Sequence, residues 1–324
     1  MITPNAFHLI IKHFDEIDKR VSSKLLSARP WSEVSLTSIL CDLLDANMQV
    51  DEKLGYSIAQ LNDDLKKDSG LFGLSLTLNA NQFSPAHERY VSQSDIGLQV
   101  VYENNIEPPL SWIKYFLLQA KRLMPSSSNP LKYNEKSTFS STDKDQELRI
   151  QELKALIGNS LKHLLYCPRP EKLDIKISQK LNYHRLKILT THIFDYIEGL
   201  EIHKDLILTE PTTAAGVFVA DDITLVKNLE AVHSALFTDS TPFSWFIAKL
   251  FLDHKSHGLL PYETLDTGEQ KLTKDIISGE DSVIEKLRNQ FGSDKVKIPE
   301  NFTIFPQHTL VLRFAVGQNP DRLQ

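Results

Sequence analysis

The sequence predicts an α/β protein in which helices flank a sheet, and three observations support this class. Residues 31–46 carry apolar side chains at positions 36, 39, 40, 43 and 44, a spacing typical of one helix face. Residues 96–102 and 112–118 are apolar runs joined by a polar connection with two prolines, which is typical of a hairpin. Residues 146–163 return to helical spacing and lead into a short apolar run at 164–167.

The N-terminal part is predicted to be helical. Residues 2–26 place Phe7, Ile10, Ile11 and Phe14 on one side of a helix. Pro30 ends this pattern. Ser32 is a suitable N-cap for the helix that follows.

The remaining elements follow from local patterns. Helical propensity extends over residues 56–65, whereas residues 71–78 alternate apolar and polar side chains as a strand does. Residues 125–143 are rich in Ser, Pro, Asn and Thr, which predicts a surface loop. Further on we expect helices at 181–197, 243–254 and most of 268–291, and extended segments at 215–219, 223–225 and 309–316.

The domain organisation is expected to be a core with an extension. Residues 1–180 would form the core with its N-terminal helices, and residues 181–324 would form an α+β extension packed on it. A single continuous domain is the alternative, because no linker of marked composition separates the two ranges.

Polar residues occur at matching ends of the predicted hairpin. Asp95 opens its first strand, and Gln119, Ala120 and Lys121 lie near the end of its second strand. Side chains alternate along a strand, so Gln119 and Lys121 share one face and Ala120 takes the other. An acid that faces Gln and Lys on a neighbouring strand predicts a site for a metal ion and a water. The alternatives are an ordinary strand-start Asp and a polar edge pair.

These residues resemble the signature of the PD-(D/E)XK nuclease superfamily. That signature is an Asp at a strand start followed by (Asp/Glu)-x-Lys on the next strand, and Gln119-Ala120-Lys121 corresponds to its Q-x-K variant. The segments SDIGL and LLQAKRL are similar to segments found in branches of the restriction and phage-defence nucleases. The resemblance covers residues 31–168. It implies a restriction-endonuclease-like αβββαβ core with a mixed sheet flanked by helices.

The resemblance implies phosphodiester hydrolysis that depends on Mg²⁺ or Mn²⁺, with DNA as the expected substrate, in bacterial anti-phage defence or restriction. Asp95, Gln119 and the Ala120 carbonyl would hold the ion, and Lys121 would orient water or neutralise developing charge. Because Gln119 replaces an acid, the site has one negative charge fewer. Glu33 resembles the helix acid that many members direct into the site, and a first-turn charge on the helix dipole is the equal alternative.

The charge distribution favours phosphate binding near this motif. The net charge of the chain is −6, yet residues 114–187 hold 15 Lys and Arg against 7 Asp and Glu. A solvated basic face is the alternative. The candidate nucleic-acid contacts are Arg122, Gln146, Arg149, Gln151 and Lys154.

Other features restrict the class of protein. Cys41 and Cys167 lie in apolar surroundings and are expected to be buried free thiols, which fits a reducing cytoplasm. The sequence contains no P-loop, GxSxG or GxGxxG motif, no apolar run long enough for a membrane, and an N-terminus unlike a signal peptide. A homodimer or a protein partner is compatible with the motif. The alternative function is an inactive nuclease-fold module that binds nucleic acid or a partner protein.

Overall fold

The computed structural model describes residues 3–27, 31–50, 54–69, 74–82, 94–126, 132–140, 144–191, 214–252, 268–280, 282 and 308–317. The α-helices are α1 (Pro4–Ser23), α2 (Glu33–Leu44), α3 (Ile58–Ser69), α4 (Lys144–Ile157), α5 (Ile175–Thr191), α8 (Leu229–Ser234), α9 (Phe243–Leu252) and α10 (Gly268–Ser278). The strands are β1 (Leu74–Gln82), β2 (Ile96–Asn104), β3 (Trp112–Arg122), β4 (Leu161–Tyr166), β5 (Val217–Ala220), β6 (Ser240–Pro242) and β7 (His308–Val316).

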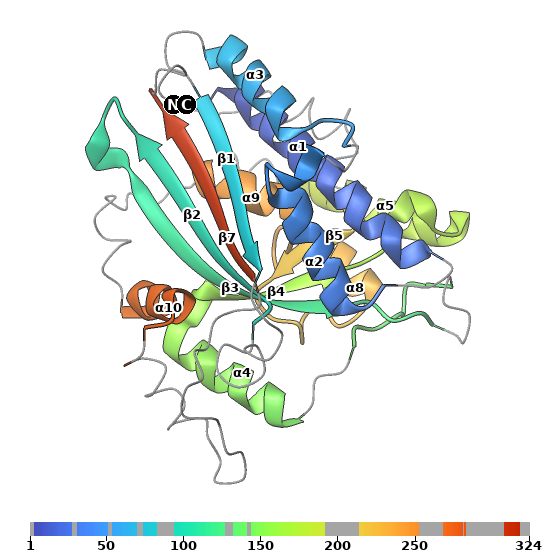
Figure 1. Ribbon diagram of the computed structural model, residues 1–324. Helices are drawn as coiled ribbons and strands as arrows, with labels where there is room; N and C mark the ends of the chain where they lie inside the picture. Colours follow the sequence, from blue (N-terminus) through green and yellow to red (C-terminus); the bar gives the residue numbers. More distant parts are fainter. Residues whose placement is uncertain are drawn as a thin grey trace.

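The strands form one mixed sheet in the order β1-β7-β2-β3-β4-β5-β6 (Figure 1). Strands β2 and β3 are antiparallel, as the hairpin pattern predicts, and β3 and β4 are parallel. Strand β7 runs parallel to β2 and antiparallel to β1. The α/β class with a sheet flanked by helices is therefore confirmed, and strands from both halves of the chain share the sheet.

Helices cover both faces of this sheet. A large buried cluster joins one face to α1, α2, α3 and α9, and a smaller cluster joins the other face to α4 and α10 (Figure 1). Helix α1 begins where Thr3 accepts a hydrogen bond from the N–H of Ala6 (3.0 Å), and its predicted apolar side is buried. Burial of each large side chain contributes about 1.5–3 kcal/mol to folding.

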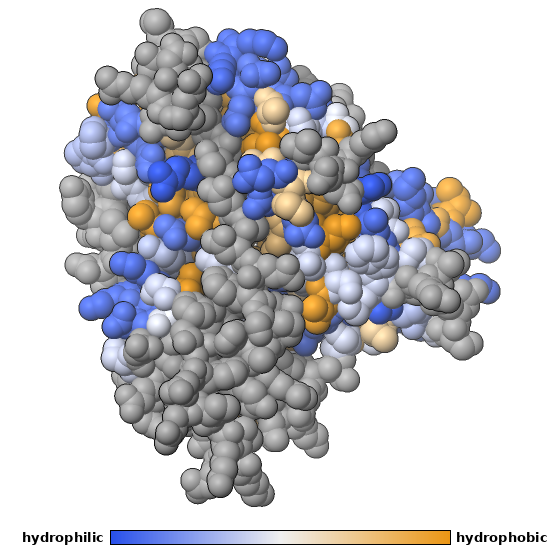
Figure 2. All heavy atoms as spheres, in the orientation of Figure 1, coloured by the Kyte–Doolittle hydropathy of each residue, from blue (hydrophilic) through white to orange (hydrophobic). Residues whose placement is uncertain are grey.

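The surface of the described residues is mixed in character. Figure 2 shows one face on which hydrophobic residues form small groups between hydrophilic ones. None of the described helices combines the length and the hydrophobicity of a membrane span. Cys41 and Cys167 are buried free thiols, as predicted.

Two sequence-based boundaries are wrong. The helix predicted at 146–163 ends at Ile157, because Gly158 adopts a left-handed φ of +52° and starts a 3₁₀ turn that leads into β4. Residues 223–225 form a turn and not a strand. There the Asp222 carboxylate accepts hydrogen bonds from the Thr224 N–H (2.9 Å) and hydroxyl (2.8 Å).

Two further differences concern tertiary packing. The segment predicted as a surface loop at 125–143 contributes buried Tyr133 and Phe139, so residues 132–140 of it are packed against the core. The strand predicted at 309–316 exists, but its position between β1 and β2 was not predicted. Residues 71–73, 192–197, 253–254, 281 and 283–291 of other predicted elements lie outside the described residues.

Candidate functional site

Asp95 lies directly before the start of β2 and is fixed there by backbone hydrogen bonds to both neighbouring strands. Its N–H donates to the Leu118 carbonyl of β3, and its carbonyl accepts from the His308 N–H of β7, both at 2.9 Å. The residue is 1% exposed. A buried carboxylate needs hydrogen bonds in place of water, so its partners define the site.

The structure brings Asp95 and Gln119 together. The Asp95 carboxylate accepts through Oδ2 from Gln119 Nε2 (2.9 Å) and from the Ala120 N–H (2.7 Å). Gln119 lies opposite Asp95 because the register pairs Ile96 with the preceding Leu118. The amide nitrogen of Gln119, and not its oxygen, therefore faces the carboxylate.

The other end of the Gln119 amide has no partner. Its Oε1 is buried and accepts no hydrogen bond from the residues that the structure describes. Leaving a buried acceptor unsatisfied costs about 1–3 kcal/mol. Such an oxygen is suited to a donor or a cation that a ligand supplies.

Lys121 and Glu33 also meet at this end of the sheet. Lys121 is 4% exposed, and its Nζ lies 3.9 Å from Glu33 Oε1. The other oxygen, Oε2, accepts from the Arg122 N–H (3.0 Å) and the Ser140 hydroxyl (2.8 Å). Glu33 is in the first turn of α2, with Ser32 as N-cap as predicted, and it reaches β3. Glu33 is therefore a first-turn charge of α2 and also lies beside Lys121.

Further unsatisfied polar atoms lie on strands β3, β4 and β7, beside or next to the strands that carry Asp95 and Gln119. Within the described residues, the strand ends near Asp95 and Gln119 hold buried side-chain atoms that make no hydrogen bond. They are Arg122 Nε, His163 Nδ1, both ring nitrogens of His308, and Thr309 Oγ1. Unsatisfied buried groups are uncommon in folded proteins, so their occurrence on the adjacent central strands β3, β4 and β7 marks this part of the sheet as a candidate site, although His13 Nε2 on α1 is another such atom.

His163 was not singled out from the sequence. It is the direct neighbour of Gln119 in the parallel β3–β4 pair and is 6% exposed. Burial, together with the nearby Lys154 and Lys121, lowers the pKa of its imidazole to about 4. A single histidine in a buried strand belongs to no spacing motif. The one indication in the sequence was that, if β3 and β4 pair, His163 can lie beside Gln119 on the same face of the sheet.

The residues predicted to contact nucleic acid do not cluster around Asp95 and Gln119. Lys154 donates to the Asp221 carbonyl (2.8 Å) and lies 3.7 Å from Asp222 Oδ2, so its ammonium is directed to the segment after β5. Gln151 is exposed on α4, and Arg122 is half-buried beside Tyr133. The side chains of Gln146 and Arg149 lie outside the described residues.

The residue types here suit a single hard cation, but the orientation of the Gln119 amide does not. Asp95, Gln119 and Ala120 bring a carboxylate, an amide oxygen and a backbone carbonyl, which suit Mg²⁺ or Mn²⁺. In the structure Gln119 Nε2 donates to both Asp95 (2.9 Å) and the Ala120 carbonyl (3.4 Å), so the amide must turn over before its unsatisfied Oε1 can share an ion with them. In the described residues, no three or more His, Cys, Asp and Glu side chains are grouped so that they could hold a metal. The donor set therefore carries one full charge from Asp95 and does not suit a two-metal centre.

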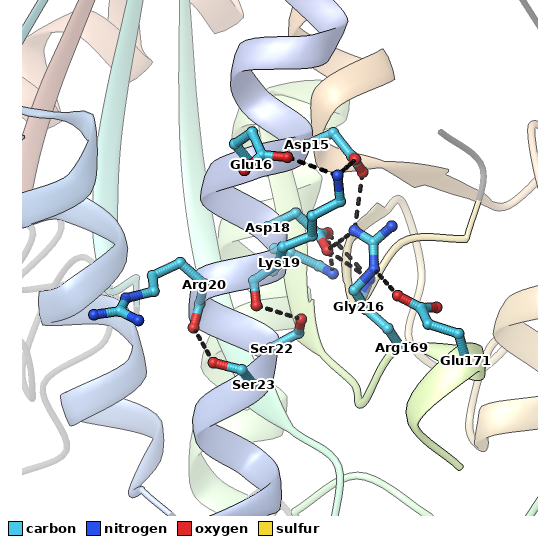
Figure 3. Close-up of polar contacts among 11 residues, drawn as sticks. Asp15, Glu16, Asp18, Lys19, Arg20, Ser22, Ser23, Arg169, Glu171 and Gly216 are labelled. Atoms are coloured by element: carbon cyan, nitrogen blue, oxygen red, sulfur yellow. Dashed lines mark hydrogen bonds and ion pairs between the residues drawn. The ribbon is translucent and has the colours of Figure 1, made fainter. Parts of the chain in front are cut away.

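A second buried polar cluster joins α1 to the start of β5 (Figure 3). Arg169 donates from Nη1 to Asp15 (2.9 Å) and Asp18 (2.7 Å), and from Nε to Glu171 (2.7 Å). Asp18 also accepts from backbone N–H groups of β5, the closest being that of Val217 at 2.6 Å. The sequence did not single out this cluster.

A cavity of about 420 Å³ lies beside this second cluster and is lined by residues of α1 and by Arg169 and Glu171. Lys19 and Arg169 of its lining are paired with carboxylates of the protein. Lys19, for example, contacts Asp15 at 3.0 Å and Glu16 at 2.7 Å, as Figure 3 shows. The groups are paired within the protein, so we interpret this cluster as structural.

Comparison of the chain with protein-family models, with curated proteins and with solved structures finds no match.

Proposed function

We propose that this chain is a metal-dependent nuclease of the PD-(D/E)XK type that hydrolyses phosphodiester bonds of DNA. One observation carries the proposal. A buried Asp95 and a buried Gln119 lie on neighbouring strands, and Gln119 Oε1 has no hydrogen-bond partner among the described residues. Lys121 follows on the same face, at the spacing of the family motif.

The arrangement of the elements supports the proposal in part. The order α2-β1-β2-β3-α4-β4, interrupted by α3, agrees with the αβββαβ core that the motif implies. The antiparallel β2–β3 pair and the parallel β3–β4 pair agree with it as well. The insertion of β7 between β1 and β2 is a departure from a simple three-stranded meander.

The proposed chemistry divides between the ion and the protein. A bound Mg²⁺ or Mn²⁺ would act as a Lewis acid on the scissile phosphate and lower the pKa of bound water. Asp95, Gln119 and the Ala120 carbonyl would hold the ion. Lys121 would stabilise phosphoryl oxygens, since its 3.9 Å separation from Glu33 exceeds hydrogen-bond length and leaves its donors for substrate. Glu33 would position Lys121.

A second candidate function follows from the weak donor set. The Gln119 amide already donates to Asp95, and the described residues of the site supply no third acid. These observations favour a nuclease-fold module that does not cut and that binds nucleic acid or a partner protein.

Cleavage assays distinguish the two functions. Linear and supercoiled DNA are incubated with the full chain and Mg²⁺ or Mn²⁺, with EDTA as the blank. We expect cleavage by the wild type, a loss of at least 100-fold in Lys121→Ala, and unchanged cleavage by Lys66→Ala, which removes an exposed α3 ammonium. Full activity in Lys121→Ala excludes the proposed mechanism. DNA binding without cleavage supports the second candidate.

A further inference from the structure

Asp95, Gln119 and His163 form a row across three adjacent strands. The β2–β3 register places Gln119 opposite Asp95, and the β3–β4 register pairs Gln119 with His163. Residues that are paired on neighbouring strands point to the same face of the sheet. All three residues are buried, so water does not serve their polar groups freely. The Gln119 amide therefore has a carboxylate on one neighbouring strand and an imidazole on the other.

The amide is turned so that its nitrogen faces the carboxylate. Nε2 lies 2.9 Å from Asp95 Oδ2 and 3.4 Å from the Ala120 carbonyl oxygen, which are the two other groups of the proposed cation site. Oε1 is buried and accepts no hydrogen bond from the described residues. His163 Nδ1 is also buried and makes no hydrogen bond within the described part of the chain. Two unsatisfied polar atoms therefore occur on a pair of registered neighbours.

A half-turn of the Gln119 amide exchanges its two ends. Oε1 then takes the place of Nε2, at the 2.9 Å spacing from Asp95 Oδ2 that Nε2 now has. Two oxygens at right angles around Mg²⁺ are about 2.8–3.0 Å apart, because each metal–oxygen bond is about 2.0–2.1 Å long. The spacing therefore suits two oxygens that share one ion. Nε2 moves to the buried place of Oε1, where its N–H groups need an acceptor.

We propose that His163 Nδ1 is this acceptor, and that His163 is a positioning residue that holds the Gln119 amide with its oxygen towards the ion. A neutral imidazole whose proton is on Nε2 accepts a hydrogen bond at Nδ1. The inference rests on the cation site of the proposed function, and it adds a residue that lies outside the Gln-x-Lys motif. A carboxylate has two equivalent oxygens and needs no such partner, so the role of His163 follows from the glutamine.

Calorimetric titration of the full chain with Mn²⁺ tests this role at about pH 8, where an imidazole is neutral. His163→Leu removes the acceptor and should weaken binding about 10- to 100-fold, the usual effect of losing a group that orients a metal ligand. His163→Asn keeps an oxygen near the position of Nδ1 and should restore most of the affinity. His13→Leu is the matched control, because His13 is a buried histidine of α1 beside Tyr56, and it should leave the affinity unchanged.

Equal Mn²⁺ affinity in the wild type and in folded His163→Leu overturns the inference, and so does equal weakening in His163→Leu and His163→Asn. Failure of the wild type to bind Mn²⁺ refutes the cation site itself, and with it both the proposed function and the inference. Binding that is independent of His163 refutes the inference alone, so the two failures are distinguishable. Circular dichroism confirms that each variant folds.

A double substitution shows whether His163 acts through the amide. In the Gln119→Glu background, His163→Leu should change Mn²⁺ affinity by no more than about twofold, because a carboxylate has no amide to orient. An undiminished effect of His163→Leu in that background means that the imidazole acts in another way, which overturns the inference.

A measurement on the wild type covers a variant that does not fold. In protein labelled with ¹⁵N-histidine, Mg²⁺ should shift the Nδ1 resonance of His163 upfield, as expected when a ring nitrogen begins to accept a hydrogen bond. An Nδ1 resonance that stays in place while calorimetry shows Mg²⁺ binding overturns the inference.

Discussion

The two buried polar clusters differ in how completely their groups are paired. In the Arg169 cluster, Arg169 donates to three carboxylates, and Asp18 accepts from the guanidinium and from two backbone N–H groups. In the Asp95 cluster, Asp95 accepts from Gln119 and Ala120, yet Gln119 Oε1 and His163 Nδ1 have no hydrogen-bond partner within the described residues.

This difference separates a structural role from a functional one more clearly than charge does. The Arg169 cluster has the larger number of formal charges, but its groups satisfy one another. The Asp95 cluster has fewer charges and leaves buried polar atoms unused, which costs free energy unless a ligand engages them. The comparison predicts that changes in the Arg169 cluster alter stability and that changes in the Asp95 cluster alter binding and catalysis.

The largest expected effect is on the structural cluster. Arg169→Met leaves the buried Asp18 without its cation and Asp15 with Lys19 alone, so the free energy of unfolding should fall by about 3–5 kcal/mol. Arg20→Met is the control, because Arg20 is exposed and points away from Arg169 in Figure 3, and its effect should stay within about 0.5 kcal/mol. Urea unfolding measures both. Equal stability of the two variants would refute the structural role.

The pH dependence of stability should have opposite signs in the two clusters. Burial raises the pKa of Asp18 from 3.8 to about 6, so its contribution favours folding below about pH 4 and is lost as pH rises through about 6. Burial lowers the pKa of His163 from 6.5 to about 4, so its contribution is present above pH 6.5 and is lost as pH falls through about 4. Each contribution is on the order of 2–3 kcal/mol.

Urea unfolding in EDTA at several pH values between 4 and 7 tests this opposition. Asp18→Asn should make the rise of stability with pH steeper, and His163→Gln should make it shallower. Slopes that change in the same direction in both variants would contradict the assignment.

A smaller effect distinguishes two buried glutamines. Gln49 is 5% exposed and uses both ends of its amide, with Nε2 donating to the Leu43 carbonyl (2.6 Å) and Oε1 accepting from the Ile58 N–H (2.9 Å). Gln49→Met should therefore cost about 2 kcal/mol, whereas Gln119→Met, which also removes an unsatisfied oxygen, should cost about 1 kcal/mol or less. Thermal and urea unfolding give the difference, and a larger cost at Gln119 would mean that its amide is fully used.

The sequence predicts local elements well where one pattern decides them. Residues 112–118 are an apolar run after a proline-bearing connection, which predicts β3 and places Asp95 opposite Gln119. Apolar residues at 156, 157 and 161 continue the helical spacing past Gly158, although Gly158 ends the helix. Ile223 and Leu225 are apolar, yet Asp222 directs that segment into a turn.

Tertiary features required the structure. No local pattern relates residues 308–316 to residues 74–82 and 96–104, so the position of β7 could not be predicted. His163 and Ser140 join the candidate site through strand register and loop packing, which depend on contacts distant in the sequence. The Arg169 cluster likewise links residues about 150 positions apart.

The most direct test of the account is a calorimetric titration of the full chain with Mn²⁺. We predict one binding site in the wild type, no binding in Asp95→Ala because the ion loses its carboxylate, and retained or slightly tighter binding in Lys121→Ala because a nearby positive charge is removed. Gln119→Glu should tighten binding, and Asp15→Asn in the structural cluster should leave it unchanged. Mn²⁺ binding that survives in Asp95→Ala, or that is absent from the wild type, would contradict the assignment of a cation site to Asp95 and Gln119.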